Sequence, residues 1–137
     1  MDSNNDLHIK KFLPIWVWII ALIQIGLVLF FSVGTLMNPG NFIPGVSELD
    51  YVTQLYVTRN ITTVIGIVIA LLLRSHIALL IMLIVRVLTD LSDVITVYAL
   101  NVEVIKSSVP MVVAILIIPA LFAIGYLWKR VNQESKR

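Results

Sequence analysis

The sequence predicts an all-α integral membrane protein, a four-helix up-down bundle with both termini on the cytoplasmic side. Three observations predict this fold class: a very apolar composition, four long apolar stretches, and basic residues gathered on one side of those stretches. Of the 137 residues, 59% are hydrophobic and only 13% are charged. A water-soluble domain needs polar residues over its outside, whereas a bundle in a bilayer can expose Leu, Ile and Val to lipid. The composition therefore places the chain in the membrane class.

The four apolar stretches are long enough to cross a bilayer. A helix rises about 1.5 Å per residue, so about 20 apolar residues span a hydrocarbon core of roughly 30 Å. The stretches cover residues 12–37, 52–73, 77–100 and 109–128. Because backbone groups find no water in hydrocarbon, each stretch must be helical despite its many β-branched residues. Residues 12–128 then form one transmembrane domain between two cytoplasmic tails, 1–11 and the basic 129–137.

The connections between the stretches are short, which favours antiparallel neighbours. Residues 38–45 hold two Pro-Gly pairs, which mark a turn. After them, Ser47 is the expected N-cap of the second helix, with Glu48 and Asp50 in a first turn where the helix dipole favours negative charge. The second and third helices are joined by residues 74–76 alone, so we expect them to run side by side.

The distribution of Lys and Arg predicts the direction of the crossings, because positive residues concentrate in cytoplasmic loops. On one side of the four stretches the basic residue is Lys106. The other side holds Lys10, Lys11, Arg74, Lys129, Arg130, Lys136 and Arg137. Both termini lie on the richer side, so we expect the chain in the inner (plasma) membrane with its ends in the cytoplasm.

Four charged residues fall inside the stretches, at a cost of about 2.5 to 3.5 kcal/mol each on insertion scales. Arg59 is on the second stretch, and Arg86, Asp90 and Asp93 are on the third. The spacing of four and three residues places the last three on one helix face. Counting outward from the short turn puts Arg59 beside Asp93, which predicts an interhelical salt bridge. Arg86 is then left to pair with Asp90, and the four charges sum to zero.

Uncharged residues extend this polar cluster. Gln24 lies near the middle of the first stretch and shares a face with Val28, Phe31 and Thr35, so we expect it to hydrogen-bond into the cluster. Arg59, Thr62, Thr63, Gly66 and Ala70 are expected on one face of the second helix. The candidate site residues are Arg59, Arg86, Asp90, Asp93, Gln24 and Thr63.

Proline distinguishes the fourth stretch. Pro119 has no N–H group, so the carbonyl of Ile115, four residues earlier, loses its helical donor. We expect a kink or an extra hydrogen-bond acceptor at this place.

Three functions fit the cluster, and the sequence names no reaction. In the first, the cluster binds a lipid-like molecule such as a quinone or isoprenoid, with Asp90 or Asp93 as acid–base group in a catalytic version. In the second, the chain is a non-enzymatic accessory or structural subunit of a larger membrane complex, with Gly66 and Ala70, or Gly26 and Gly34, against the partner. In the third, it is a proton-coupled carrier that acts as an oligomer. A purely structural role is the simplest alternative: the four charges neutralise one another and lock the bundle.

Several classes of partner are disfavoured. The basic residues lie at the ends of the stretches rather than in a patch, so we expect no nucleic acid. The chain has no cysteine and no nucleotide-binding motif, so thiolate metal sites and ATP use are not expected. We expect neither a metal nor a cofactor. The expected partners are membrane lipid, a lipophilic small molecule, and a second copy of the chain or a larger membrane protein.

One family resemblance rests on the second and third stretches, roughly half of the chain. The pair Arg59-Asn60, followed by Gly66 and then by Arg86 and the acidic Asp90 and Asp93, resembles small uncharacterised four-helix bacterial proteins of the DoxX-like kind. The resemblance implies an inner-membrane four-helix bundle whose four charged residues form a polar centre. It leaves the activity open.

Overall fold

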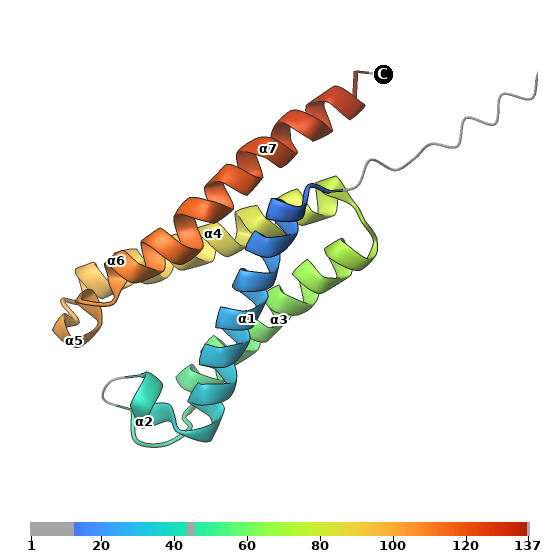
Figure 1. Cartoon of the computed structure of the whole chain (residues 1–137). Coiled ribbons are helices and arrows are strands. Elements are labelled where there is room, and N and C mark those ends of the chain that lie inside the picture. Colours follow the sequence, from blue (N-terminus) through green and yellow to red (C-terminus); the bar gives the residue numbers. More distant parts are fainter. Residues whose placement is uncertain (1–12, 44–45, 137) are drawn as a thin grey trace, which may run out of the picture.

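The computed structural model describes residues 13–43 and 46–136, and these are almost entirely helical, with no β-strand among them (Figure 1). The all-α prediction is therefore confirmed. The helices are α1 (Ile15–Met37), α2 (Pro39–Phe42), α3 (Tyr51–Leu72), α4 (His76–Ala99), α5 (Glu103–Lys106), α6 (Val109–Val112), the π-helix η1 (Val113–Ile117) and α7 (Ile118–Glu134). The last three follow one another without a break and act as one long segment.

Three of these segments are long and apolar enough to cross a membrane: α1, α3, and the continuous segment Val109–Glu134. They indicate a membrane-spanning protein. α4 is as long, with 24 residues, but it carries Arg86, Asp90 and Asp93. The boundaries of the helices and tails differ slightly from the predicted ones. α7 continues to Glu134, so most of the predicted C-terminal tail is helical, whereas the predicted tail 1–11 lies outside the described residues.

The start of α3 differs from the prediction of a Ser47 cap. Asp50 is the N-cap, and its Oδ1 accepts a hydrogen bond from the backbone N–H of Thr53 at 2.7 Å. Hydrogen bonds from the backbone and the side chain of Thr53 lower the pKa of the Asp50 carboxyl group, which is exposed and lies just before the helix. Both Ser and Asp are good caps, but only Asp adds a negative charge beside the helix N-terminus. Ser47 and Glu48 consequently lie before the helix, so Ser47 is not its cap and neither Glu48 nor Asp50 is in its first turn.

A tight reversal joins α3 to α4. Arg74 adopts a left-handed backbone conformation with φ of 50°, which ends α3. Ser75 then caps α4, because its Oγ accepts a hydrogen bond from the N–H of Ala78 at 3.2 Å. At the same end of the molecule, His76 Nδ1 lies 2.9 Å from Glu134 Oε1, which links the start of α4 to the end of α7. We call this the terminal end, and the opposite end, where α2 and α5 lie, the loop end (Figure 1).

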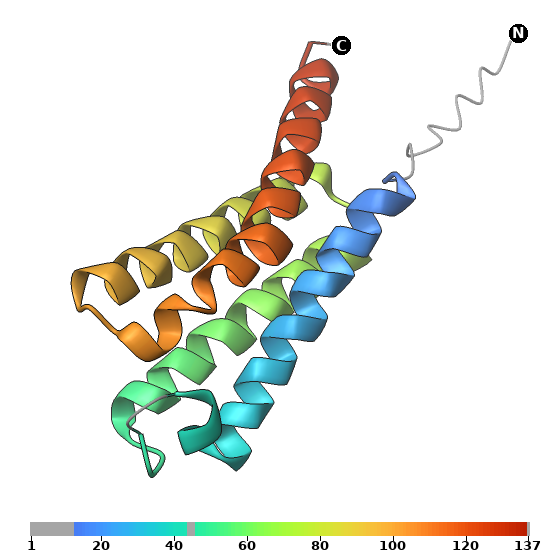
Figure 2. The same cartoon turned by 60° about the vertical axis from the view of Figure 1, so that its left-hand side comes forward.

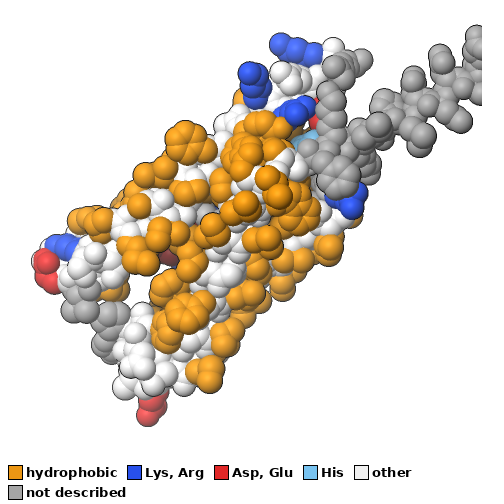
Figure 3. Space-filling model, viewed as in Figure 1, with side chains coloured by type: hydrophobic (Ala, Val, Ile, Leu, Met, Phe, Trp, Pro, Cys, Tyr) orange, Lys and Arg blue, Asp and Glu red, His pale blue; other side chains and the backbone are white. Residues whose placement is uncertain are grey.

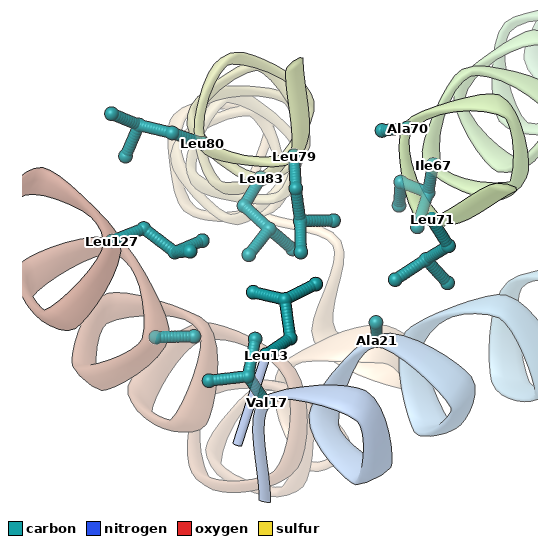
Figure 4. Packing of buried hydrophobic residues seen from close by; sticks show 11 residues of the cluster. Leu13, Val17, Ala21, Ile67, Ala70, Leu71, Leu79, Leu80, Leu83 and Leu127 are labelled. Carbon is teal, nitrogen blue, oxygen red and sulfur yellow. The ribbon is translucent and has the colours of Figure 1, made fainter. Parts of the chain in front are cut away.

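The terminal half of the molecule has an apolar core to which all the long segments contribute. Figure 4 shows most of its buried side chains pointing into the space between the helices, although Leu80 points away from Leu79 and Leu83. The buried side chains are Leu13, Val17, Ala21, Ile67, Ala70, Leu71, Leu79, Leu80, Leu83, Ala123 and Leu127. Gly66 permits close packing of α3 on α4, since a Cβ there would lie 2.3 Å from the Cε atom of Met82. The four segments are therefore firmly joined at this end.

The loop half is more open. α1 packs with α3, side by side in Figure 2, and α4 packs with α7; the two pairs diverge toward the loop end in Figure 1. We call α1 with α3 the first limb, and α4 with η1 and α7 the second limb. Residues 91–99 of α4 include no buried residue, whereas Ser32 and Thr35 near the same end of α1 are buried. Figure 3 shows the surface hollowed between the two limbs, with acidic side-chain atoms visible inside the hollow.

The helix is disturbed beside Pro119, as its chemistry predicts. The π-helical turn η1 lies directly before α7, whose second residue is Pro119. A π-helical turn widens the helix and disturbs the usual pairing of its carbonyls. The carbonyl that accepts a side-chain bond is that of Leu116, the residue after the predicted Ile115.

Candidate functional site

A buried ion pair on α4 forms the centre of the candidate site. Arg86 and Asp90 are only 5% and 4% exposed. The Nε atom of Arg86 donates to Asp90 Oδ2 at 3.1 Å, and its Nη2 atom donates to Asp90 Oδ1. This two-point contact between residues one turn apart is the geometry in which a guanidinium binds a carboxylate most strongly. The predicted pairing of Arg86 with Asp90 is confirmed.

Asn60 is a member of this centre that the sequence analysis left out. Its Oδ1 atom accepts a hydrogen bond from Arg86 Nη1 at 2.9 Å, and its side chain is 2% exposed. The bond joins α3 to α4. A signal was present in the sequence, because Asn60 lies three residues from both Val57 and Thr63 and so shares their helix face.

The buried face of α3 is consequently rotated from the predicted one. Asn60, Thr63 and Ala70 are buried, whereas Arg59 and Thr62 are exposed. The predicted face was built around Arg59 as an inward-pointing residue. A long Arg side chain can reach a partner on the next helix from the edge of the interface, so it need not occupy the buried face.

A second ion pair lies at that edge. Arg59 Nη2 donates to both carboxylate oxygens of Asp93, at 3.0 and 2.9 Å, which confirms the predicted interhelical salt bridge. The side chains are 43% and 42% exposed, in contrast to the buried pair one turn away. The guanidinium of Arg59 also lies over the ring of Tyr56, 5.6 Å from its centroid. Tyr56 thus holds Arg59 by a cation–π contact in addition to the salt bridge.

Thr63 is buried as a member of the centre, but its hydroxyl makes a local contact. Its Oγ1 atom donates to the carbonyl of Arg59 at 2.7 Å. The bond satisfies the hydroxyl within its own helix. Thr63 therefore borders the ion pairs without bonding to their charged groups.

Gln24 crosses between the two limbs instead of bonding to the charged residues, so that part of the prediction is wrong. Its Nε2 atom donates to the carbonyl of Leu116 at 2.7 Å, from α1 to η1. The acceptor lies in the π-helical turn, whereas the charged groups of the cluster pair with one another. Val28 and Thr35 are buried with Gln24 as predicted, whereas Phe31 is exposed.

Two buried polar atoms have no hydrogen-bond partner in the described part of the chain: Gln24 Oε1 and Ser32 Oγ. Both belong to the inward face of α1, and the two residues are at most 1% exposed. Buried polar atoms are normally paired, so each unpaired one requires an explanation.

The polar interior is confined to the loop half. The buried polar residues of the described chain are Gln24, Ser32, Thr35, Thr53, Asn60, Thr63, Arg86 and Asp90. On α1, α3 and α4 alike, these residues lie on the loop side of the apolar core residues. With Arg59 and Asp93, the interior carries two positive and two negative charges, and each charge has an opposite partner.

A separate apolar groove runs over α1 and α2. Its volume is about 530 Å³, and it contains none of the predicted site residues. Its lining is Gly26, Leu29, Phe30, Val33, Gly34, Met37, Asn38 and Phe42. Within residues 13–43 and 46–136, no group of three or more His, Asp or Glu side chains could hold a metal ion.

The small residues expected to meet a partner protein are mostly covered by the chain itself. A Cβ on Gly34 would lie 2.2 Å from the ring of Phe42, and Gly66 is covered by Met82. Ala70 belongs to the apolar core. Gly26 alone of the four has no atom within 4 Å of such a Cβ. The predicted partner face is therefore used for packing within the chain.

Comparison with known proteins found no match among family models, curated proteins or solved structures. The resemblance to DoxX-like proteins thus stays a sequence prediction.

Proposed function

We propose that the chain crosses the inner (plasma) membrane four times, with both termini in the cytoplasm. Three segments have the length and apolarity of spans, and α4 is of matching length. The charges on α4 are compatible with its insertion because pairing lowers their cost: Arg86 pairs with Asp90, and Asp93 pairs with Arg59. The direction rests on the basic residues of the terminal end, because Arg74 lies in the reversal between α3 and α4, and Lys129, Arg130 and Lys136 lie at the end of α7 or just after it.

On this topology, the polar centre of the loop half binds the head group of a lipophilic small molecule, such as a quinone or an isoprenoid. The apolar tail lies between the limbs, and the molecule enters from the outer leaflet, toward which the limbs diverge. The charged pairs supply donors and acceptors that lipid lacks. A polar head group gains more from such groups in hydrocarbon than in water, because no water competes for them.

One observation carries this proposal: polar burial and divergence of the limbs occur in the same half of the molecule. Arg86, Asp90 and Asn60 are buried where the limbs meet, and the half-exposed pair of Arg59 and Asp93 lies beside them. Beyond Asp90 toward the loop end, no residue of α4 is buried. A pair that only locked the bundle would need neither an opening nor the additional uncharged polar residues around it.

The experiment is a binding titration of the full chain in lipid nanodiscs, with farnesol and a short-chain ubiquinone as probes. We expect saturable binding of at least one probe and a loss of about tenfold or more in affinity on Asp93→Asn. The reason is that the substitution breaks the salt bridge and changes the donors at the centre.

The matched control is Glu103→Gln, which removes a carboxylate from the ion pair with Lys106 in the α5 turn, away from the centre. This variant should bind as the unmodified chain does. If neither probe binds saturably, or if both variants lose affinity equally, the proposed function is wrong.

A further inference from the structure

The head group that suits this centre carries no net charge. Arg59 is paired with Asp93 and Arg86 with Asp90, so the four charges cancel. An ionised ligand would lose its hydration on entering the space between the limbs, at a cost that only an unpaired opposite charge could offset. The described residues of the centre offer no such charge. A carboxylate or phosphate head is therefore disfavoured.

The buried oxygen of Gln24 that lacks a hydrogen-bond partner specifies the head group further. Gln24 Oε1 is a carbonyl-type oxygen and can only accept a hydrogen bond. Its orientation is set by the bond from Nε2 to Leu116, because a flipped amide would place two oxygens together. An unmet acceptor is satisfied by an O–H or N–H group and not by a quinone or ester carbonyl.

The position of Gln24 places this acceptor at the depth of the buried ion pair. Its amide bridges α1 and η1 at Leu116, and the next residue, Ile117, packs against Val87 on α4. Val87 directly follows Arg86 in the chain. The Gln24–Leu116 bond thus joins the limbs where Arg86 and Asn60 also join them. Ser32 Oγ, two turns closer to the loop end on the same face of α1, is also unpartnered.

We propose that the occupant of the centre is an uncharged lipid alcohol whose hydroxyl group donates a hydrogen bond to Gln24 Oε1. The tail of this alcohol runs from Gln24 past Ser32 toward the loop end. This inference rests on the proposed function and narrows its ligand class from quinones and isoprenoids to molecules with a free hydroxyl.

The test compares three probes that share one isoprenoid tail: farnesol, farnesyl methyl ether and farnesoate. Affinity is measured with the full chain in nanodiscs of zwitterionic lipid, at a pH where farnesoate is ionised. We expect farnesol to bind about tenfold or more tightly than either of the others, since the ether lacks the donor and the acid carries a charge. This comparison uses the unmodified chain, so it does not depend on how any variant folds.

The variant Gln24→Met removes the acceptor with little change in side-chain length. It should abolish the preference for farnesol over the methyl ether. Gln54→Met is the matched control, because Gln54 is exposed on α3 and the chemical change is the same. The control should keep the preference.

The outcomes separate the two proposals. If the ether or farnesoate binds as tightly as farnesol, or if Gln24→Met keeps the preference, the lipid-alcohol assignment is wrong while the binding function stands. If no probe with this tail binds and ubiquinone binds, the assignment is also wrong. If nothing binds saturably, both proposals fail.

Discussion

The two halves of this molecule differ in the polar side chains that they bury: the loop half buries polar residues among apolar ones such as Val28, Val87 and Ile117, whereas the terminal half has an apolar core. In the terminal half the core is apolar, with residues such as Val17, Leu79 and Leu127 fully buried. In the loop half the same helices bury Gln24, Asn60 and Arg86. In a membrane, helices associate through close packing and through hydrogen bonds between polar groups, and buried charged groups add a cost of insertion. The polar burial and the divergence of the limbs occur in the same half, and they are the basis of the proposed binding function.

The largest expected effect comes from breaking the buried ion pair. We expect Arg86→Met to lower the free energy of unfolding by about 3–5 kcal/mol, because Asp90 keeps an uncompensated charge and Asn60 loses its donor. The measurement is an SDS titration of the purified chain in mixed micelles.

The double variant Arg86→Met with Asp90→Leu is the control. It removes both charges, so it should recover most of the lost stability. A double variant as unstable as the single one would show that the buried charge is not the cause.

In the terminal half, we expect stability to depend on apolar packing instead of on charge pairing. Leu79→Ala opens a cavity at a fully buried position, and we expect a loss of about 2 kcal/mol in the free energy of unfolding. Leu72→Ala on α3 is the matched control, because Leu72 is 76% exposed and should change stability little. Equal losses at the two positions would contradict the assigned core.

A smaller effect is expected where α3 and α4 approach closely. Gly66→Ala places a Cβ 2.3 Å from the Met82 Cε atom, and this flexible side chain can move, so we expect a cost of about 1 kcal/mol. Adding Met82→Ala should remove the clash. Gly125→Ala, with no atom within 4 Å of the new Cβ, should be neutral or slightly stabilising. The account fails here if Gly125→Ala is the more damaging change in the same SDS titration.

The smallest expected effect on stability comes from the N-cap of α3, which belongs to neither the polar centre nor the apolar core. The pKa of Asp50 is lowered by its hydrogen bonds from Thr53. The folded state thus binds this proton less readily than the unfolded state. The stabilisation is present above the unfolded pKa and is lost as the pH falls through the folded pKa.

The variant Asp50→Asn keeps a good N-cap without a titrating group, so it should remove this part of the pH dependence. The check is helix content by circular dichroism between neutral and strongly acidic pH. An unchanged acid profile in the variant would contradict the role of Asp50.

The contrast between the halves was only partly predictable from the sequence. Length and apolarity predict the helices, and the short turn after α3 fixes the depth at which Arg59 meets Asp93, so that pair follows from counting. The sequence does not predict which face of α3 is buried, because Arg59 and Asn60 are neighbours and either could face inward. Asn60 was missed for that reason.

The partner of Gln24 was equally hidden. The acceptor is a backbone carbonyl in a π-helical turn, and no side-chain pattern reports which carbonyl such a turn frees. Pro119 predicts a disturbance in that region, at the carbonyl of Ile115, but it does not identify the carbonyl of Leu116 as the acceptor for Gln24. The N-cap of α3 was missed because Ser47 and Asp50 are both suitable caps three residues apart.

The central claim is that the loop half, and not the terminal half, holds the ligand. The most direct measurement is photo-cross-linking of the full chain in nanodiscs with a photoreactive farnesol analogue, with and without excess farnesol, mapped by peptide mass spectrometry. We expect the cross-links abolished by farnesol to lie within residues 24–35, 53–63 and 86–97. Competed cross-links that cluster around Val17, Leu79 and Leu127, or that spread evenly along the helices, would contradict it.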